Sequence, residues 1–162
     1  MLKKIGLFFV ASVAIFIAGG IALGNTYTIQ KTYFISTNEQ ALTAYLSDVA
    51  NWTQWFYPKH KHAQVENNTL TLTTKNDTII RVELSGKSSQ TFAFVINATG
   101  NEIHTTLQLE PMVPSQERTK ITAILQGKSD FSPISGYTNL FIKASLEGIF
   151  NSSFAQLDKV FE

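Results

Sequence analysis

Few side chains in this sequence could perform acid–base chemistry inside a folded domain. The candidates are Tyr33, Tyr57, Tyr137 and Asp48, because an enzyme needs an ionisable or hydroxyl group within hydrogen-bonding distance of the proton that it moves. Asp48 stands just before a predicted short turn at Asn51, where a side-chain oxygen accepts hydrogen bonds from free backbone N–H groups. This position favours a capping role for Asp48, and the sequence predicts no catalytic residue.

The histidines and the absence of cysteine limit the metal chemistry that is available. His60 and His62 would face the same way on an extended strand, as a pair of metal ligands requires. Lys59 and Lys61 place positive charge beside them, and no carboxylate or cysteine nearby completes a ligand set. We therefore expect no metal ion, and no pattern indicates another cofactor.

Aromatic residues give the best indication of a binding site. Trp52 and Trp55 lie three residues apart in a short turn that Pro58 ends. Tryptophan is amphipathic and is common at the mouths of ligand pockets, so either side chain could line one. The alternative is that one or both simply fill the end of the fold between a sheet and a helix.

One long helical pattern closes the chain, from Leu140 to Phe161. Its apolar side chains recur every three or four residues, which places them on one face of a helix. The stripe consists of Leu146, Phe150, Phe154, Leu157 and Phe161, with Ile142, Ile149 and Val160 beside it. Gly148 lies within this helix, costs about 1 kcal/mol relative to alanine, and could leave room beside Phe150 and Phe154.

The preceding chain predicts an antiparallel sheet. A strand at 28–35 is followed by a helix that Thr37 and Gln40 would cap, and by the short turn at Asn51. Alternating apolar segments separated by turn residues then predict five or six strands between residues 70 and 125. One face of this sheet is apolar and needs a cover, which only the helices can supply. We expect Leu72, Val82, Phe94, Leu107 and Ala123 to face the last helix.

The N-terminus predicts a membrane anchor. Lys3 and Lys4 precede the uncharged stretch from Ile5 to Leu23, which as a helix could span a hydrocarbon core of about 30 Å. Lysines on the N-terminal side place that end in the cytoplasm. We expect a single-pass transmembrane helix at 1–24 in the cytoplasmic (inner) membrane and a domain at 25–162 on its outer, periplasmic side. A cleaved signal peptide is the alternative.

Two stretches of the sequence resemble the START-like superfamily, also called SRPBCC, which includes polyketide cyclase/dehydrase and lipid-transport proteins. They are Tyr33-Phe34-Ile35-Ser36-Thr37 and Asp48-Val49-Ala50-Asn51-Trp52-Thr53-Gln54-Trp55. The resemblance also includes the order of elements from about Thr28 onward. It implies an α+β helix-grip fold: a curved antiparallel β-sheet around a long C-terminal helix, with two short helices after the first strand.

The resemblance further implies a small apolar ligand held between the sheet and the last helix. The cavity candidates on this reading are Trp55, Tyr57, Phe92, Phe94, Leu107, Phe150 and Phe154. One departure concerns the segment from Thr69 to Thr74, which has neither the glycines nor the tryptophan that many relatives carry there. The polar lining and entrance of the cavity therefore cannot be carried over from relatives.

Composition narrows the classes of partner. The net charge of the chain is +1, and Lys3 and Lys4 alone account for more than this positive excess. The rest of the chain is therefore nearly neutral, and we do not expect nucleic acid as a partner. The leading hypothesis is a membrane-anchored, extracytoplasmic domain that binds a hydrophobic or lipid-like small molecule. The alternatives are a structural or assembly domain with a filled core, and an enzyme of the cyclase or dehydratase type.

Overall fold

The computed structural model describes residues 2–112, 117–129, 132 and 134–162, and side chains from Phe9 onward. The elements in chain order are α1 (Leu2–Ala22), β1 (Thr26–Ile35), α2 (Glu39–Ser47), the 3-10 helix η1 (Val49–Asn51), α3 (Trp52–Trp55), β2 (His62–Glu66), β3 (Thr69–Thr73), β4 (Ile79–Lys87), β5 (Thr91–Ala98), β6 (Asn101–Pro111), β7 (Thr119–Lys128) and α4 (Ser135–Val160).

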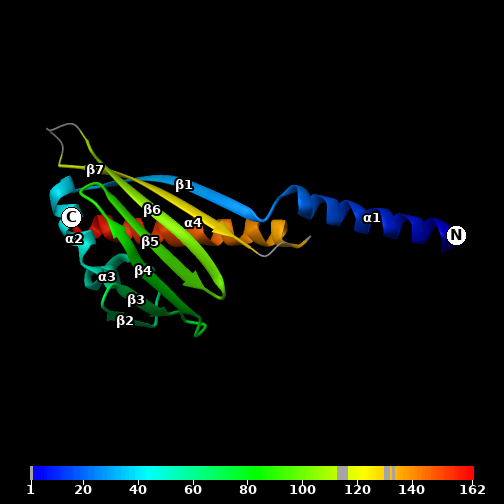
Figure 1. Cartoon of the computed structure of the whole chain (residues 1–162), viewed down its shortest axis with the longest axis horizontal. Helices are drawn as coiled ribbons and strands as arrows, with labels where there is room; N and C mark the ends of the chain where they lie inside the picture. The colour runs from blue at the N-terminus through cyan, green and yellow to red at the C-terminus, as the bar shows by residue number, and fades with distance from the viewer. Residues whose placement is uncertain (1, 113–116, 130–131, 133) are drawn as a thin grey trace.

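The strands form one antiparallel sheet of seven strands in the order β1-β7-β6-β5-β4-β3-β2. Strands β2 to β7 follow one another as a meander, whereas β1 pairs with the last strand, with Ile29 opposite Leu125. This pairing places the first strand at one edge of the sheet and β2 at the other. The sheet curves, and α4 lies against one face of it (Figure 1).

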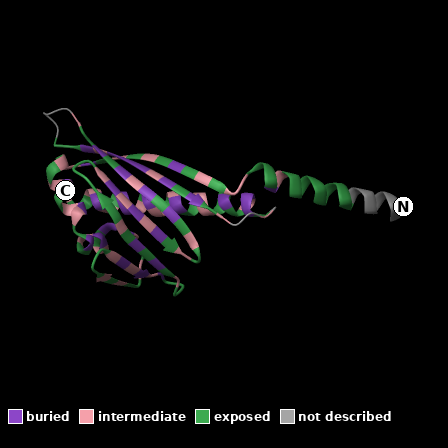
Figure 2. Ribbon diagram, viewed as in Figure 1, coloured by how far each residue is buried: buried purple, intermediate pink, exposed green. Residues whose placement is uncertain are grey.

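The core lies between the sheet and α4. The predicted inward positions Leu72, Val82, Phe94, Leu107 and Ala123 are all buried, which confirms the alternation expected from the sequence. Leu146, Phe150, Phe154 and Leu157 of α4 belong to the same buried cluster. In Figure 2 the strands alternate between buried and exposed positions along their length, as one wet face requires.

The short helices begin at polar caps. Asn38, and not the predicted Thr37, caps α2: its side-chain oxygen accepts from the N–H of Ala41 at 2.9 Å. Asp48 caps η1 by accepting from the N–H of Ala50 at 2.9 Å, which is the role that the sequence favoured for it. Together these caps set α2 and α3 across one end of the sheet, beside the C-terminal half of α4 (Figure 1).

The predicted transmembrane anchor is wrong, and with it the predicted single-pass location in the inner membrane. A membrane span needs about 20 consecutive apolar residues in one helix. Among the residues that the structure describes, no helix combines the length and apolarity that crossing a bilayer requires. The fold that the structure describes is the sheet with its helices, and none of the described helices qualifies as a transmembrane span.

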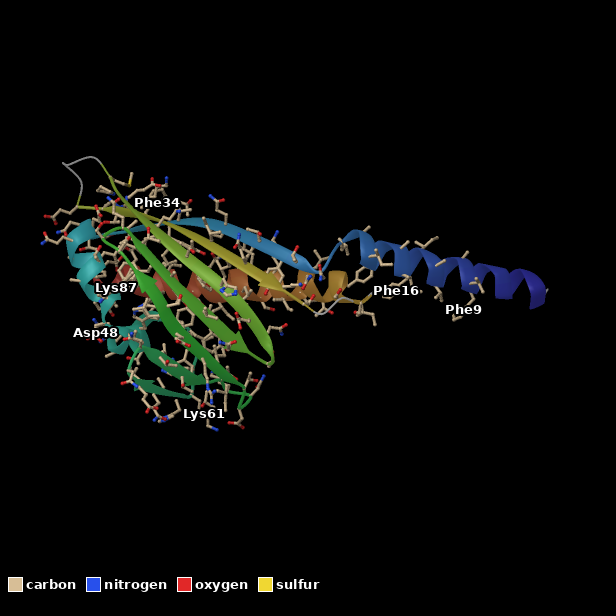
Figure 3. The ribbon with its side chains drawn as sticks, viewed as in Figure 1. Phe9, Phe16, Phe34, Asp48, Lys61 and Lys87 are labelled. Carbon is tan, nitrogen blue, oxygen red and sulfur yellow. The ribbon has the colours of Figure 1, made fainter. Side chains whose placement is uncertain are left out.

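The C-terminal end of α1 packs against the start of α4. Tyr137 stacks on Phe16 with ring centroids 4.7 Å apart, and its hydroxyl donates to the Phe16 carbonyl at 3.0 Å. Gly136 lies so close to Gly20 that a Cβ atom there would overlap the Gly20 carbonyl oxygen. The earlier turns of α1 project away from the domain with exposed apolar side chains such as Phe9 (Figure 3).

Candidate functional site

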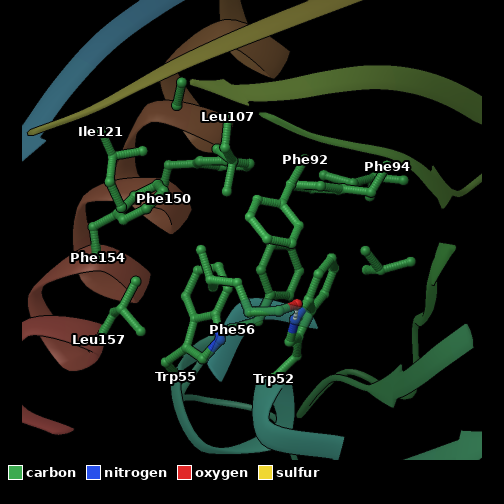
Figure 4. Packing of buried hydrophobic residues seen from close by; sticks show 14 of the residues in the cluster. Trp52, Trp55, Phe56, Phe92, Phe94, Leu107, Ile121, Phe150, Phe154 and Leu157 are labelled. Carbon is green, nitrogen blue, oxygen red and sulfur yellow. Dashed lines mark hydrogen bonds between the residues drawn. The ribbon is translucent and has the colours of Figure 1, made fainter. Parts of the chain in front are cut away.

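An aromatic cluster occupies the space between the sheet, α3 and α4 (Figure 4). Phe56 lies at its centre, with ring centroids 6.2 Å from Phe94 and 6.0 Å from Phe150. Trp55 contacts Phe154 at 5.5 Å, and Trp52 contacts Phe94 at 5.1 Å. Because edge-to-face and tilted pairs at these separations are favourable, the rings stabilise one another as well as the fold.

Two buried polar atoms in this apolar region have no hydrogen-bond partner among the described residues: Trp55 Nε1 and Thr105 Oγ1. The indole N–H of the neighbouring Trp52, in contrast, is paired: its Nε1 donates to the Leu46 carbonyl at 2.9 Å. Thr105 lies on the inward phase of β6, opposite Phe94 of β5. Buried polar groups are normally paired, and leaving one unpaired costs about 1–3 kcal/mol.

Two adjoining depressions open along α4, and we call them together the α4 groove. The first, of about 300 Å³, is the Tyr57 depression, and the second, of about 240 Å³, lies at the β5–β6 turn; they share Ser145. The Tyr57 depression is lined by Tyr57, Pro58, Lys59, Ser145, Gly148, Ile149 and Ser152. The second is lined by Ala98, Thr99, Asn101, Ile103, Thr138, Phe141, Ile142, Ser145 and Leu146.

The groove follows from the spacing of residues on α4. Thr138, Ile142, Ser145, Ile149 and Ser152 repeat every three or four residues, so they form a stripe beside the buried stripe of the same helix. The stripe alternates small hydroxyl side chains with isoleucines. Such a lining suits a molecule that has both apolar and hydrogen-bonding parts.

Tyr57 holds an unusual backbone conformation at the mouth of the first depression, with φ of 48°. Left-handed backbone costs a bulky residue about 1–3 kcal/mol, and such residues cluster at ligand sites. Its N–H donates to the buried Ser153 Oγ at 2.9 Å, and its carbonyl lies 2.9 Å from His60 Nδ1. Contacts from α4 and from the following loop thus hold this turn in place.

The predicted cavity residues divide into two groups. Tyr57 lines the α4 groove. The other six are buried in the core cluster and line neither depression: Trp55, Phe92, Phe94, Leu107, Phe150 and Phe154. Their role as ligand contacts stays a prediction.

Sequence reasoning missed Lys59, Ser145 and Ser152, although the repeat of small polar residues along α4 was a signal for the two serines. It did single out Gly148, which lies in the Tyr57 depression with nothing within 4 Å of the position of an added Cβ atom.

The four candidates for acid–base chemistry lie in different places. Asp48 caps η1, and the Tyr137 hydroxyl is bonded to α1. The Tyr33 hydroxyl donates to Asn151 Oδ1 at 2.9 Å, on the side of α4 that faces β1. Burial, with a smaller effect from Glu147, raises the pKa of Tyr33 to about 12. Of the four, only Tyr57 lines the α4 groove.

A wider depression of about 510 Å³ lies at the ends of β1, β6 and β7. Its lining includes the polar side chains of Glu102, His104, Gln126 and Lys128. His104 Nε2 lies 2.9 Å from Glu102 Oε1, so these two groups already satisfy each other. This depression is lined by strand residues alone, whereas the α4 groove adjoins the helix that covers the sheet, so we prefer the α4 groove as the candidate site.

Comparison with known proteins identifies the fold. No family model matches the sequence, and no curated protein does. Among solved structures, the chain is similar to the XoxI protein of Bacillus cereus (TM-score 0.62, 12% identity, covering 83% of this chain and 94% of that one). It is also similar to a START superfamily protein of Mycobacterium smegmatis (TM-score 0.59, 12% identity, 82% and 98%).

A third similar structure is the di-domain ARO/CYC protein BexL from the BE-7585A biosynthetic pathway (TM-score 0.61, 8% identity), of which this chain spans 49%. At such identities a likeness establishes the fold alone. The chain therefore has the helix-grip-like fold of START and cyclase-type SRPBCC structures.

Proposed function

We propose that this chain binds a hydrophobic or amphipathic small molecule between the sheet and α4, and that the α4 groove is the entrance. The proposal is carried by one observation: the Tyr57 depression lies between α4 and the turn that directly follows Phe56, a member of the aromatic cluster. Its volume of about 300 Å³ is at the lower end of the range for small-molecule sites, which is about 300–1,000 Å³.

The unpaired polar atoms support a ligand that reaches inward. Trp55 is two residues from Tyr57, which lines the mouth, and Thr105 is the next inward position after Ile103, which lines the second depression. A molecule with an acceptor for Trp55 Nε1 would offset the cost of that buried N–H group. The surrounding rings would supply apolar contact for the rest of the molecule, at about 25 cal/mol per Å² buried.

A second candidate function is a structural or assembly domain whose core is complete without a ligand. The observation that favours it is the aromatic cluster itself, in which Phe56 contacts both Phe94 of the sheet and Phe150 of α4. Under this alternative the groove is only a surface feature. The two candidates differ in one measurable property, which is saturable binding of an apolar molecule.

The test blocks the mouth without disturbing the core. In Gly148→Trp the indole would occupy the Tyr57 depression, because the space at Gly148 is open. The matched control is Ala144→Trp, at an exposed position one turn earlier on α4 that lines neither depression. The full-length proteins are titrated with the neutral dye N-phenyl-1-naphthylamine, followed by its fluorescence, and native mass spectra of each are recorded for co-purifying molecules.

We expect saturable dye binding to the natural protein and to Ala144→Trp, and at least tenfold weaker binding to Gly148→Trp, since the indole fills the volume that the dye needs. Thermal unfolding of all three proteins checks that each is folded. A folded natural protein that shows neither saturable dye binding nor a co-purifying molecule would support the filled-core alternative. Equal binding to all three proteins would place the site elsewhere.

A further inference from the structure

We infer that the ligand is an amphipathic acid whose anionic group lies at the mouth of the Tyr57 depression, against Lys59. This inference rests on the proposed function and adds to it the chemical class of the ligand and its direction. The apolar part would point inward to the aromatic cluster, and the charged end would stay at the wet rim, where desolvation costs least.

The charge at the mouth of the Tyr57 depression is positive. Lys59 is the only lysine, arginine or carboxylate among the residues described as lining the Tyr57 depression. Two other lysines are already paired: Lys61 lies 3.0 Å from Asp77, and Lys31 lies 3.1 Å from Glu147. Within the part of the chain that the structure describes, Lys59 has no such carboxylate, so its charge is available to a ligand.

Hydroxyl groups beside Lys59 can complete the recognition of an anion. Tyr57 and Ser145 line the same depression, and neither side chain donates a hydrogen bond to any described residue. Ser152 differs, because its hydroxyl donates to the Ile149 carbonyl at 2.8 Å. A carboxylate accepts several hydrogen bonds at once, and bonds to an ionised acceptor are the stronger kind.

The uncharged part of the lining fits the same direction. Pro58, Gly148 and Ile149 carry no charge, and Trp55, two residues before Tyr57, belongs to the buried core. An ionised group would lose hydration there without a partner, whereas an alkyl or ring system would gain apolar contact. A single charged residue, Lys59, within an otherwise uncharged lining therefore favours a molecule with one acidic end.

The experiment compares two ligands with the same chain and different heads, decanoate and decanol. Each competes with N-phenyl-1-naphthylamine for the full-length protein, in the natural sequence and in Lys59→Met, Lys59→Arg and Lys61→Met. Methionine keeps the length of the lysine side chain and removes its charge. Lys61→Met is the matched control, since Lys61 is two residues away and already paired with Asp77.

We expect Lys59→Met to weaken decanoate about fivefold more than it weakens decanol or the dye, as for an ion pair of about 1 kcal/mol at a partly exposed site. Lys59→Arg should restore decanoate, Lys61→Met should leave it unchanged, and added salt should reduce the effect of Lys59. Equal losses for decanoate and decanol, or no loss for either, would overturn the inference while the proposed function stands. If none of the three molecules binds saturably, both are overturned.

Discussion

Tyr33 joins the edge strand β1 to α4 through both its aromatic ring and its hydroxyl group. Its ring stacks on Phe154 with centroids 4.1 Å apart, and its hydroxyl donates to Asn151 Oδ1 at 2.9 Å. Burial of the ring, and secondly the negative charge of Glu147, disfavour the phenolate and raise the pKa of Tyr33 to about 12. The neutral hydroxyl is therefore the form that the folded protein favours.

The raised pKa predicts how stability depends on pH. Because the pKa of Tyr33 is higher in the folded protein than in the unfolded chain, its contribution is complete below pH 10 and is lost as the pH rises from 10 to 12. In Tyr33→Phe this loss is absent. The difference in unfolding free energy between natural protein and variant, measured by denaturant titration from pH 8 to 12, should shrink with pH. A constant difference would contradict the assignment.

Among the elements, the β5–β6 hairpin has an unusual turn. Its two central residues, Thr99 and Gly100, both have positive φ, of 50° and 80°. Such turns match the twist of the strands, but a β-branched threonine is poorly suited to the first position, where asparagine is preferred. Thr99 also lines the β5–β6 part of the α4 groove. A residue with strained backbone, Thr99, therefore lies in the lining of the candidate site.

We predict that Thr99→Asn stabilises the protein by about 1 kcal/mol, because asparagine tolerates left-handed backbone better. Denaturant titration of the two proteins measures the change. The control substitution, Thr99→Val, keeps the β-branched side chain and should not raise the unfolding free energy. A destabilised Thr99→Asn protein would show that the threonine side chain contributes more than the strain removes.

At the scale of the whole molecule, α4 connects the domain core to α1. Its C-terminal half packs on the aromatic cluster, while its first turns hold the end of α1 through Gly136, Tyr137 and Asn139. Asn139 Nδ2 donates to the Gly24 carbonyl at 3.4 Å. The two glycines of α4 differ in their surroundings: a Cβ atom at Gly136 would overlap α1, whereas one at Gly148 would meet open space.

This difference predicts opposite results for the same substitution at two positions of one helix. Gly136→Ala should release the end of α1, seen as faster amide hydrogen exchange in residues 16–24 with unchanged protection of the central strands. Gly148→Ala should leave that exchange unchanged and raise the unfolding free energy by about 0.5–1 kcal/mol, as alanine does in a helix interior. Equal exchange in both variants would contradict the close packing of Gly136 on α1.

Local patterns in the sequence determined the elements and the composition of the core. Period-2 alternation identified most strands and the inward residues such as Val82 and Ala123, because each strand has one wet and one buried face. The strand β2 was missed, since its edge position leaves Ala63 and Val65 only partly buried and its alternation weak. The helical stripe identified α4, although the helix begins at Ser135, before the stripe itself.

Only the tertiary structure determined the surroundings of α1 and the position of the α4 groove, because both depend on contacts between distant parts of the sequence. An apolar N-terminal stretch has the composition of a membrane anchor, but no described helix meets the length and apolarity of a span, and the last turns of α1 lie against α4. The α4 groove likewise arises only when the Tyr57 turn, which Ser153 holds, comes to lie beside Gly148. Such sites depend on contacts between residues almost a hundred positions apart, which single-sequence periodicity does not encode.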